Sequence, residues 1–63
     1  MALKATKLIR EALEQPQDAQ GLHRRKELLI QAREWAEAHR QPRLRATARR
    51  LLAETFLIRS GGQ

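Results

Sequence analysis

The chain has 63 residues, a formal net charge of +6 at pH 7 and no cysteine. A chain of this length forms a single domain, residues 1–63, and cannot easily enclose the water-excluding pocket that catalysis needs. We therefore expect no enzymatic activity and no cofactor. The lack of cysteine excludes disulfides and cysteine-based zinc sites, and it suits a reducing compartment.

Residue usage favours helix, because Ala, Leu, Glu, Gln and Arg are frequent whereas Val and Tyr are absent. Apolar spacing and helix-breaking residues predict helices over about 3–15, 18–40 and 42–59, with a flexible tail at 60–63. We therefore predict an all-α fold in which a short N-terminal helix and an antiparallel helical hairpin form a three-helix bundle. At this size the free energy gained by apolar burial nearly cancels the entropy cost of ordering the chain. Homodimerisation is therefore a second way to complete the core.

The first predicted helix, 3–15, has one apolar face. Its apolar side chains recur at spacings of three and four, at positions 5, 8, 9, 12 and 13. A helix this short is marginal alone, so we expect it to dock across the hairpin. Pro16 then breaks the pattern, and Asp18 is the expected N-cap of the next helix. Gly21 weakens helix at its own position, so a start at Leu22 is the alternative to one near Asp18.

The second predicted helix, 18–40, has a narrow apolar stripe made of Leu28, Ala32, Trp35 and His39. We expect His39 to be half-buried on this stripe rather than a catalytic base or a metal ligand. Ile30 points nearly opposite the stripe, which predicts an exposed side chain. His23 and Glu27 lie four residues apart and are expected to form an exposed pair, not a metal site.

The third predicted helix, 42–59, follows the joint formed by residues 39–42. Proline suits the first position of a helix and Gln41 is a poor cap, so Pro42 is expected to fix this turn. The apolar seam runs through Leu44, Ala48, Leu51, Thr55 and Ile58. Leu52 and Phe56 widen the seam and are assigned to the core, whereas Leu57 points away from it.

A basic window without acidic residues spans the joint, from Ala38 to Ala53. It contains five arginines, namely Arg40, Arg43, Arg45, Arg49 and Arg50. Arg24 and Arg25 add charge at the start of the second helix. Such a window favours an anionic partner, and a merely solvated surface is the competing interpretation. Because Arg49 and Arg50 point to different sides, the arginines form a sleeve rather than one flat stripe.

Ile30 and Leu57 are the two large apolar side chains that the predicted core leaves out. With the arginines of the window they form the predicted partner-binding set, which is Ile30, Leu57, Arg40, Arg43, Arg45, Arg49 and Arg50. Exposed apolar residues surrounded by arginine are typical of interface hot spots. A second copy of the chain is the other expected occupant of this surface.

Three function hypotheses follow from these features. The favoured one is a small non-enzymatic interaction protein, an adaptor, inhibitor or anti-activator of the kind that phages and mobile elements encode, which binds a larger protein. The alternative is a DNA-binding regulator of helix-turn-helix type, in which the arginines of the third helix meet phosphates and bases. The joint lacks the glycine often found in that turn, which counts against it. The third hypothesis is an architectural or co-chaperone hairpin.

Two further expectations concern chemistry and location. The histidines and carboxylates are scattered, so the sequence predicts no catalytic residue, no cofactor-binding residue and no metal ligand. With Trp35 and Phe56 assigned to the core, no aromatic side chain remains to stack on RNA bases. No apolar run approaches the roughly 20 residues of a membrane-spanning helix, and the N-terminus lacks the apolar core of a signal peptide. We therefore expect a cytoplasmic protein without a membrane span.

Overall fold

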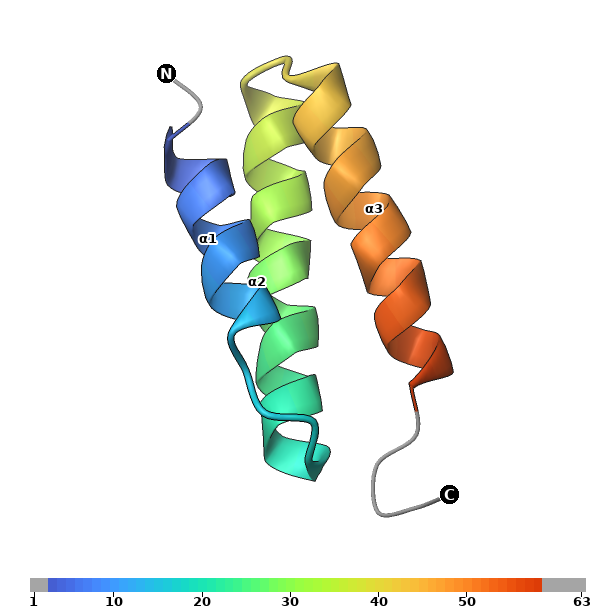
Figure 1. Cartoon of the computed structure of the whole chain (residues 1–63). Coiled ribbons are helices and arrows are strands. Elements are labelled where there is room, and N and C mark those ends of the chain that lie inside the picture. Colours follow the sequence, from blue (N-terminus) through green and yellow to red (C-terminus); the bar gives the residue numbers. More distant parts are fainter. Residues whose placement is uncertain (1–2, 59–63) are drawn as a thin grey trace.

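The computed structural model describes residues 3–58, which fold into three helices (Figure 1). Helix α1 is Leu3–Leu13, α2 is Ala19–Ala38 and α3 is Pro42–Leu57. The predicted all-α bundle is therefore confirmed, with a hairpin of α2 and α3 and an additional N-terminal helix. Helix α3 ends two residues earlier than predicted, since Ile58 is already extended. The predicted tail, 60–63, lies outside the described residues.

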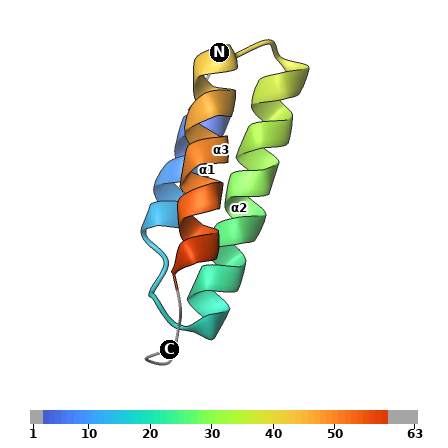
Figure 2. The ribbon, with the colours of Figure 1, turned by 90° about the vertical axis from the view of Figure 1, so that its right-hand side faces the viewer.

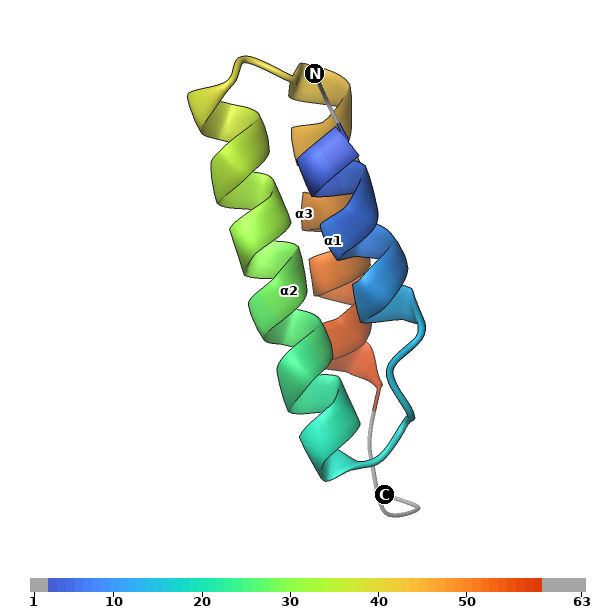
Figure 3. The same ribbon diagram turned by 90° about the vertical axis from the view of Figure 1, so that its left-hand side faces the viewer.

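Helix α2 is the centre of the bundle, and the other two helices pack along it. Figure 1 shows α1 and α3 on either side of α2, and Figure 2 shows α1 behind α3 with α2 beside them both. Helices α1 and α3 contact each other only slightly. Consecutive helices run antiparallel, so the α2–α3 joint and the start of α1 lie at one end of the molecule (Figure 3). The α1–α2 loop and the end of α3 lie at the other end.

The core divides into two clusters, one in each half of the molecule. We call residues 3–7 and 31–49 the elbow half, and residues 8–30 and 50–58 the loop half. The buried cluster of the loop half consists of Ala12, Leu28, Leu29 and Leu52. The buried cluster of the elbow half consists of Ala5, Ala32 and Ala48. Alanine lets helices approach closely but removes little apolar surface from water, so the loop half gains more from burial.

The α1–α2 loop is fixed by a cap and a close backbone approach. The backbone N–H of Gly21 donates to Asp18 Oδ1 at 2.7 Å, which confirms Asp18 as the N-cap. The alternative start at Leu22 is wrong, because α2 already begins at Ala19. A Cβ atom at position 21 would collide with the carbonyl oxygen of Pro16. Glycine therefore allows the loop to lie against the first turn of α2.

The α2–α3 joint contains an arginine in an unusual backbone conformation. Arg40 has a φ of 54°, and its N–H donates to the carbonyl of Glu37 at 3.3 Å. The N–H of Gln41 donates to the carbonyl of Ala36 at 2.8 Å. These two bonds make a Schellman motif, in which glycine usually occupies the left-handed position. Pro42 follows at the start of α3, and Gln41 makes no side-chain cap, as predicted.

Several apolar side chains lie elsewhere than predicted. Phe56 is 62% exposed because it lies on the last turn of α3, on the side away from α1. Leu13 is 48% exposed at the last residue of α1, where the chain leaves the bundle. Ile30, expected to be exposed, is half-buried and packs against the leucine cluster of the loop half. Because two helices pack on α2, its buried face is wider than one stripe.

Two polar side chains also differ from expectation. Arg25 is only 9% exposed, and its Nε donates to Thr55 Oγ1 at 2.9 Å. It therefore crosslinks α2 and α3 inside the bundle instead of adding to the basic surface. His39 is exposed rather than half-buried. Its ring stacks on Trp35 with 4.1 Å between centroids, and its Nδ1 lies 2.9 Å from the carbonyl oxygen of Trp35.

Candidate partner-binding groove

One side of the α2–α3 pair is left uncovered, because α1 packs against the other side. The residues on this uncovered flank of α2 are spaced by four, three and four, and they are Lys26, Ile30, Arg33 and Glu37. The matching flank of α3 has the same spacing and consists of Arg45, Arg49, Leu52 and Phe56. Residues at such spacings share one helical face. We call the surface formed by these two rows and Arg40 the α2–α3 groove.

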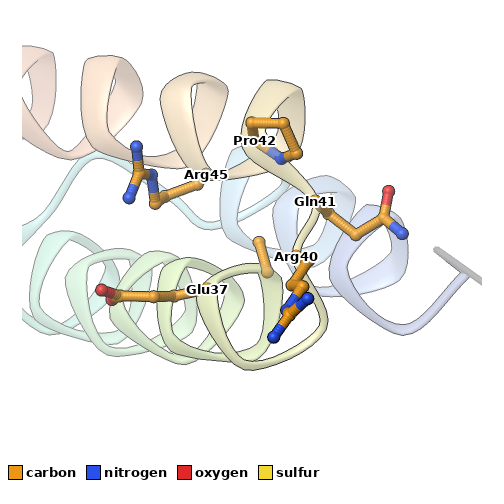
Figure 4. A pocket seen from close by; sticks show the side chains of 6 residues that line it. Glu37, Arg40, Gln41, Pro42 and Arg45 are labelled. Carbon is orange, nitrogen blue, oxygen red and sulfur yellow. The ribbon is translucent and has the colours of Figure 1, made fainter.

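The elbow end of the groove is hollowed and lined by charged side chains. A hollow of about 260 Å³ is lined by Arg33, Glu37, Arg45 and Arg49. A second hollow, of about 310 Å³, is lined by Ala36, Glu37, Arg40, Gln41, Pro42 and Arg45. The two hollows share Glu37 and Arg45 and therefore lie next to each other. Figure 4 shows Arg45 and Glu37 extending in the same direction from facing helices, while Gln41 points away at the other end.

Positive charge in this part of the groove is not neutralised. Four arginines, at positions 33, 40, 45 and 49, surround a single carboxylate, Glu37. Within residues 3–58, none of the four has an ion pair within 4.0 Å. The ion pairs lie elsewhere, between Glu27 and both His23 (3.6 Å) and Arg24 (3.7 Å), and between Arg50 and Glu54 (4.0 Å). Guanidinium groups in this state can bind carboxylates or phosphates in a bidentate way.

The loop end of the same groove is mainly apolar and carries one cationic side chain, Lys26. Leu52 and the half-buried Ile30 form its floor, and the exposed ring of Phe56 stands beside them. The ammonium nitrogen of Lys26 lies 4.6 Å from the centroid of this ring, a distance at which a cation is attracted to the aromatic face. The groove therefore changes from mainly apolar to cationic along its length.

The predicted partner-binding residues fall into two sets. Arg40, Arg45, Arg49 and Ile30 line the groove. Arg43, Arg50 and Leu57 are exposed but lie on other flanks of α3. Leu57 is 82% exposed, so its predicted position outside the core is confirmed. Its role in binding stays a prediction.

Arg33 and Phe56 belong to the groove but were not among the predicted binding residues. Arg33 lies three residues after Ile30 and four residues before Glu37, and that spacing would have placed it on the same flank. Phe56 was assigned to the core from its spacing to Leu52. Periodicity alone does not reveal that no third helix covers this flank.

The described residues also bear on metal binding and on membrane spans. In the part of the chain that the structure describes, no group of three or more His, Cys, Asp or Glu side chains is placed to hold a metal ion. None of the three helices, over the residues described, combines the length and the apolar character needed to cross a membrane. Comparisons with protein-family models, with curated proteins and with solved structures gave no match.

Proposed function

We propose that this protein is a non-enzymatic helical interaction module, an adaptor or inhibitor that binds an acidic region of a larger protein in the α2–α3 groove. The observation that carries the proposal is the set of four arginines around one carboxylate, none of them in an ion pair with a described residue. Arginine is enriched at the energetic centres of protein interfaces. The cytoplasm is the compartment that we propose, since the chain has no cysteine.

The geometry favours a protein partner over DNA. In a helix-turn-helix unit the two helices cross at about 90–120° so that the second can enter the major groove. Here α2 and α3 lie antiparallel and side by side (Figure 1). Glu37 also lies in the middle of the cationic hollows, where it would repel a phosphate backbone. A protein partner can instead meet Glu37 with a donor of its own.

The exposed Leu13 and Leu57 lie outside the groove. We propose that two copies of the chain associate by burying such exposed apolar side chains, which would be homodimerisation. Sedimentation equilibrium of the purified protein over a range of concentrations would test it. A monomer at all concentrations would rule it out.

The test of the proposed function is an affinity capture from nuclease-treated lysate with three baits: the wild type, Arg49→Glu and Arg50→Glu. These two arginines are adjacent in the chain and give the same change in net charge, but only Arg49 lines the groove. We expect one larger protein to be captured by the wild type and by Arg50→Glu and to be lost with Arg49→Glu. Its retention should weaken as salt is added, because screening shortens the range of exposed charges.

Two outcomes would contradict the proposal. If a parallel capture from untreated lysate retains material that the nuclease-treated lysate does not yield, the protein binds nucleic acid and the helix-turn-helix alternative regains support. If Arg49→Glu captures the same partner as the wild type, the α2–α3 groove is not the binding site.

A further inference from the structure

The two ends of the groove lie in one line along the helices. On α3 the groove residues run from Arg45 to Phe56, a separation of eleven residues. At a rise of 1.5 Å per residue this corresponds to about 16 Å, or three helical turns. The matching residues of α2, from Lys26 to Glu37, cover the same length in the opposite direction. The groove is therefore straight and parallel to the axes of both helices.

A surface of this shape fits an α-helix. Side chains of two packed helices form ridges, and a third helix can lay its own ridge into the groove between them. Helices that bind in this way use residues at positions i, i+3 or i+4, and i+7, which is the spacing found on both walls of the groove. A bound helix would cover the side of the α2–α3 pair that α1 leaves open, and the assembly would contain four packed helices.

The chemistry of the groove specifies which residues the bound helix must carry. At the elbow end, four arginines against one glutamate require acidic side chains. At the loop end, the ring of Phe56 and the side chain of Ile30 require an apolar side chain that excludes water from them. The two kinds of residue must lie on one face of the helix, about two turns apart.

We infer that the α2–α3 groove holds one amphipathic helix of the partner, with acidic residues at the elbow end and an apolar residue against Phe56. This inference rests on the proposed function, because it names the segment of the partner that binds. It also specifies which part of the partner helix lies at which end of the groove. The acidic and apolar parts of the helix cannot be exchanged without placing carboxylates against Phe56.

The experiment uses a labelled synthetic peptide of about 18 residues, long enough for the three turns of the groove with one turn to spare at each end. The peptide carries glutamates on one half of a helical face and leucines on the other half of the same face. A scrambled peptide has the same composition but no such face. Fluorescence anisotropy at low salt measures the Kd of each peptide for the full chain. We expect the amphipathic peptide to bind at least about tenfold more tightly than the scrambled peptide.

Two matched pairs of variants locate the bound peptide. Arg49→Glu and Phe56→Ala should each weaken binding by about tenfold or more, a change of roughly 1.4 kcal/mol. Arg50→Glu and Leu57→Ala change the neighbouring residue in the same way and should leave the Kd within about twofold. All four side chains are exposed, so we expect each variant to keep the helical circular dichroism spectrum of the wild type.

The outcomes separate this inference from the proposed function. Equal binding of the two peptides would overturn the helical occupant and leave an acidic protein partner in place. Equal losses from Phe56→Ala and Leu57→Ala, or no binding of the amphipathic peptide to the wild type, would also overturn it. A duplex DNA of equal charge that binds more tightly than the peptide and depends on Arg49 would overturn both proposals.

Discussion

The loop half and the elbow half of this protein differ in their core residues, their charge balance and their backbone conformation. In the loop half, fully buried leucines form the core, and five basic side chains are balanced by five acidic ones. The buried Arg25 is hydrogen-bonded to Thr55. In the elbow half, the fully packed core residues are alanines, and seven basic side chains face only two acidic ones. The elbow half also contains Arg40 in a left-handed conformation.

The difference shows that the features that stabilise the fold are concentrated in the loop half. The loop half has what folding requires, namely apolar burial, paired charges and a satisfied hydrogen bond across helices. The elbow half has features that lower stability, namely repulsion among arginines and a strained residue. Such features persist in proteins where a function depends on them. The difference therefore supports the elbow end of the groove as the binding site.

The largest expected effect would come from a core leucine of the loop half. Leu29→Ala should lower the free energy of unfolding by about 2–5 kcal/mol, because it leaves a cavity among fully buried residues. A domain of this length has a total stability of about 3–9 kcal/mol, so this variant is expected to be partly or wholly unfolded. Leu44→Ala, at a half-buried leucine of the elbow half, should cost about 1–2 kcal/mol. Urea unfolding would measure both free energies. Equal losses of stability in the two variants would contradict the proposed difference between the cores of the two halves.

The hydrogen bond inside the loop half should have the next largest effect. Thr55 accepts from Arg25 and donates to the carbonyl of Leu51 at 2.7 Å. Thr55→Val keeps the shape but leaves the buried Nε of Arg25 without a partner, at a cost of about 1–3 kcal/mol. Thr47→Val is the matched control, because Thr47 is half-buried on the same helix and makes no side-chain hydrogen bond among the described residues. Thermal unfolding should separate the two variants, and equal melting temperatures would argue against a role for this bond.

A change at the α2–α3 joint should raise the free energy of unfolding instead of lowering it. Arg40→Gly relieves a left-handed conformation that costs a non-glycine residue about 1–2 kcal/mol, against a loss of chain entropy of about 0.5–1 kcal/mol. We expect the free energy of unfolding to rise by about 0.5–1 kcal/mol. Arg40→Ala removes the same charge without relieving the backbone. If urea unfolding shows an equal gain for both, charge repulsion and not backbone strain is responsible.

The smallest expected effect concerns charge. Arg49→Glu places a carboxylate among the groove arginines and should raise the free energy of unfolding by about 0.3–0.5 kcal/mol. Arg50→Glu breaks the pair with Glu54 and should lower it by a similar amount. Both changes should shrink between roughly 0.01 M and 1 M salt, where the Debye length falls from about 30 Å to 3 Å. Equal effects of the two variants at low salt would show that the groove arginines do not repel one another.

Local sequence features were sufficient to predict the helices. Pro16, Asp18 and Pro42 mark helix ends by chemistry that depends only on neighbouring residues, so the observed bounds fall within two residues of those predicted. The cap at Asp18 and the proline at the start of α3 were predicted for the same reason. The role of Gly21 was not, because its cause is the carbonyl of Pro16 pressing against α2 from the preceding loop.

The groove could be predicted only in part, because it depends on which flank α1 covers. Periodicity places Arg45, Arg49 and Phe56 on one face of α3. It does not distinguish the exposed Phe56 from the buried Leu52, and it assigns both to the core. The burial of Arg25 was equally inaccessible, since its partner, Thr55, lies thirty residues away in the chain. Packing between helices decides these positions, and a single sequence does not encode it in any local pattern.

The central position of α2 has a consequence for how the chain folds. Each helix packs against its neighbour in the sequence, and α1 and α3 scarcely touch, so nearly all packing between helices joins consecutive helices. Helical domains with such low contact order fold in microseconds to milliseconds. The α1–α2 pair leaves a ribosome first, and α3 joins it last. Because α3 supplies Arg45, Arg49 and Phe56, the groove exists only once α3 has docked, and a partner that requires it will recognise only chains in which α3 has folded.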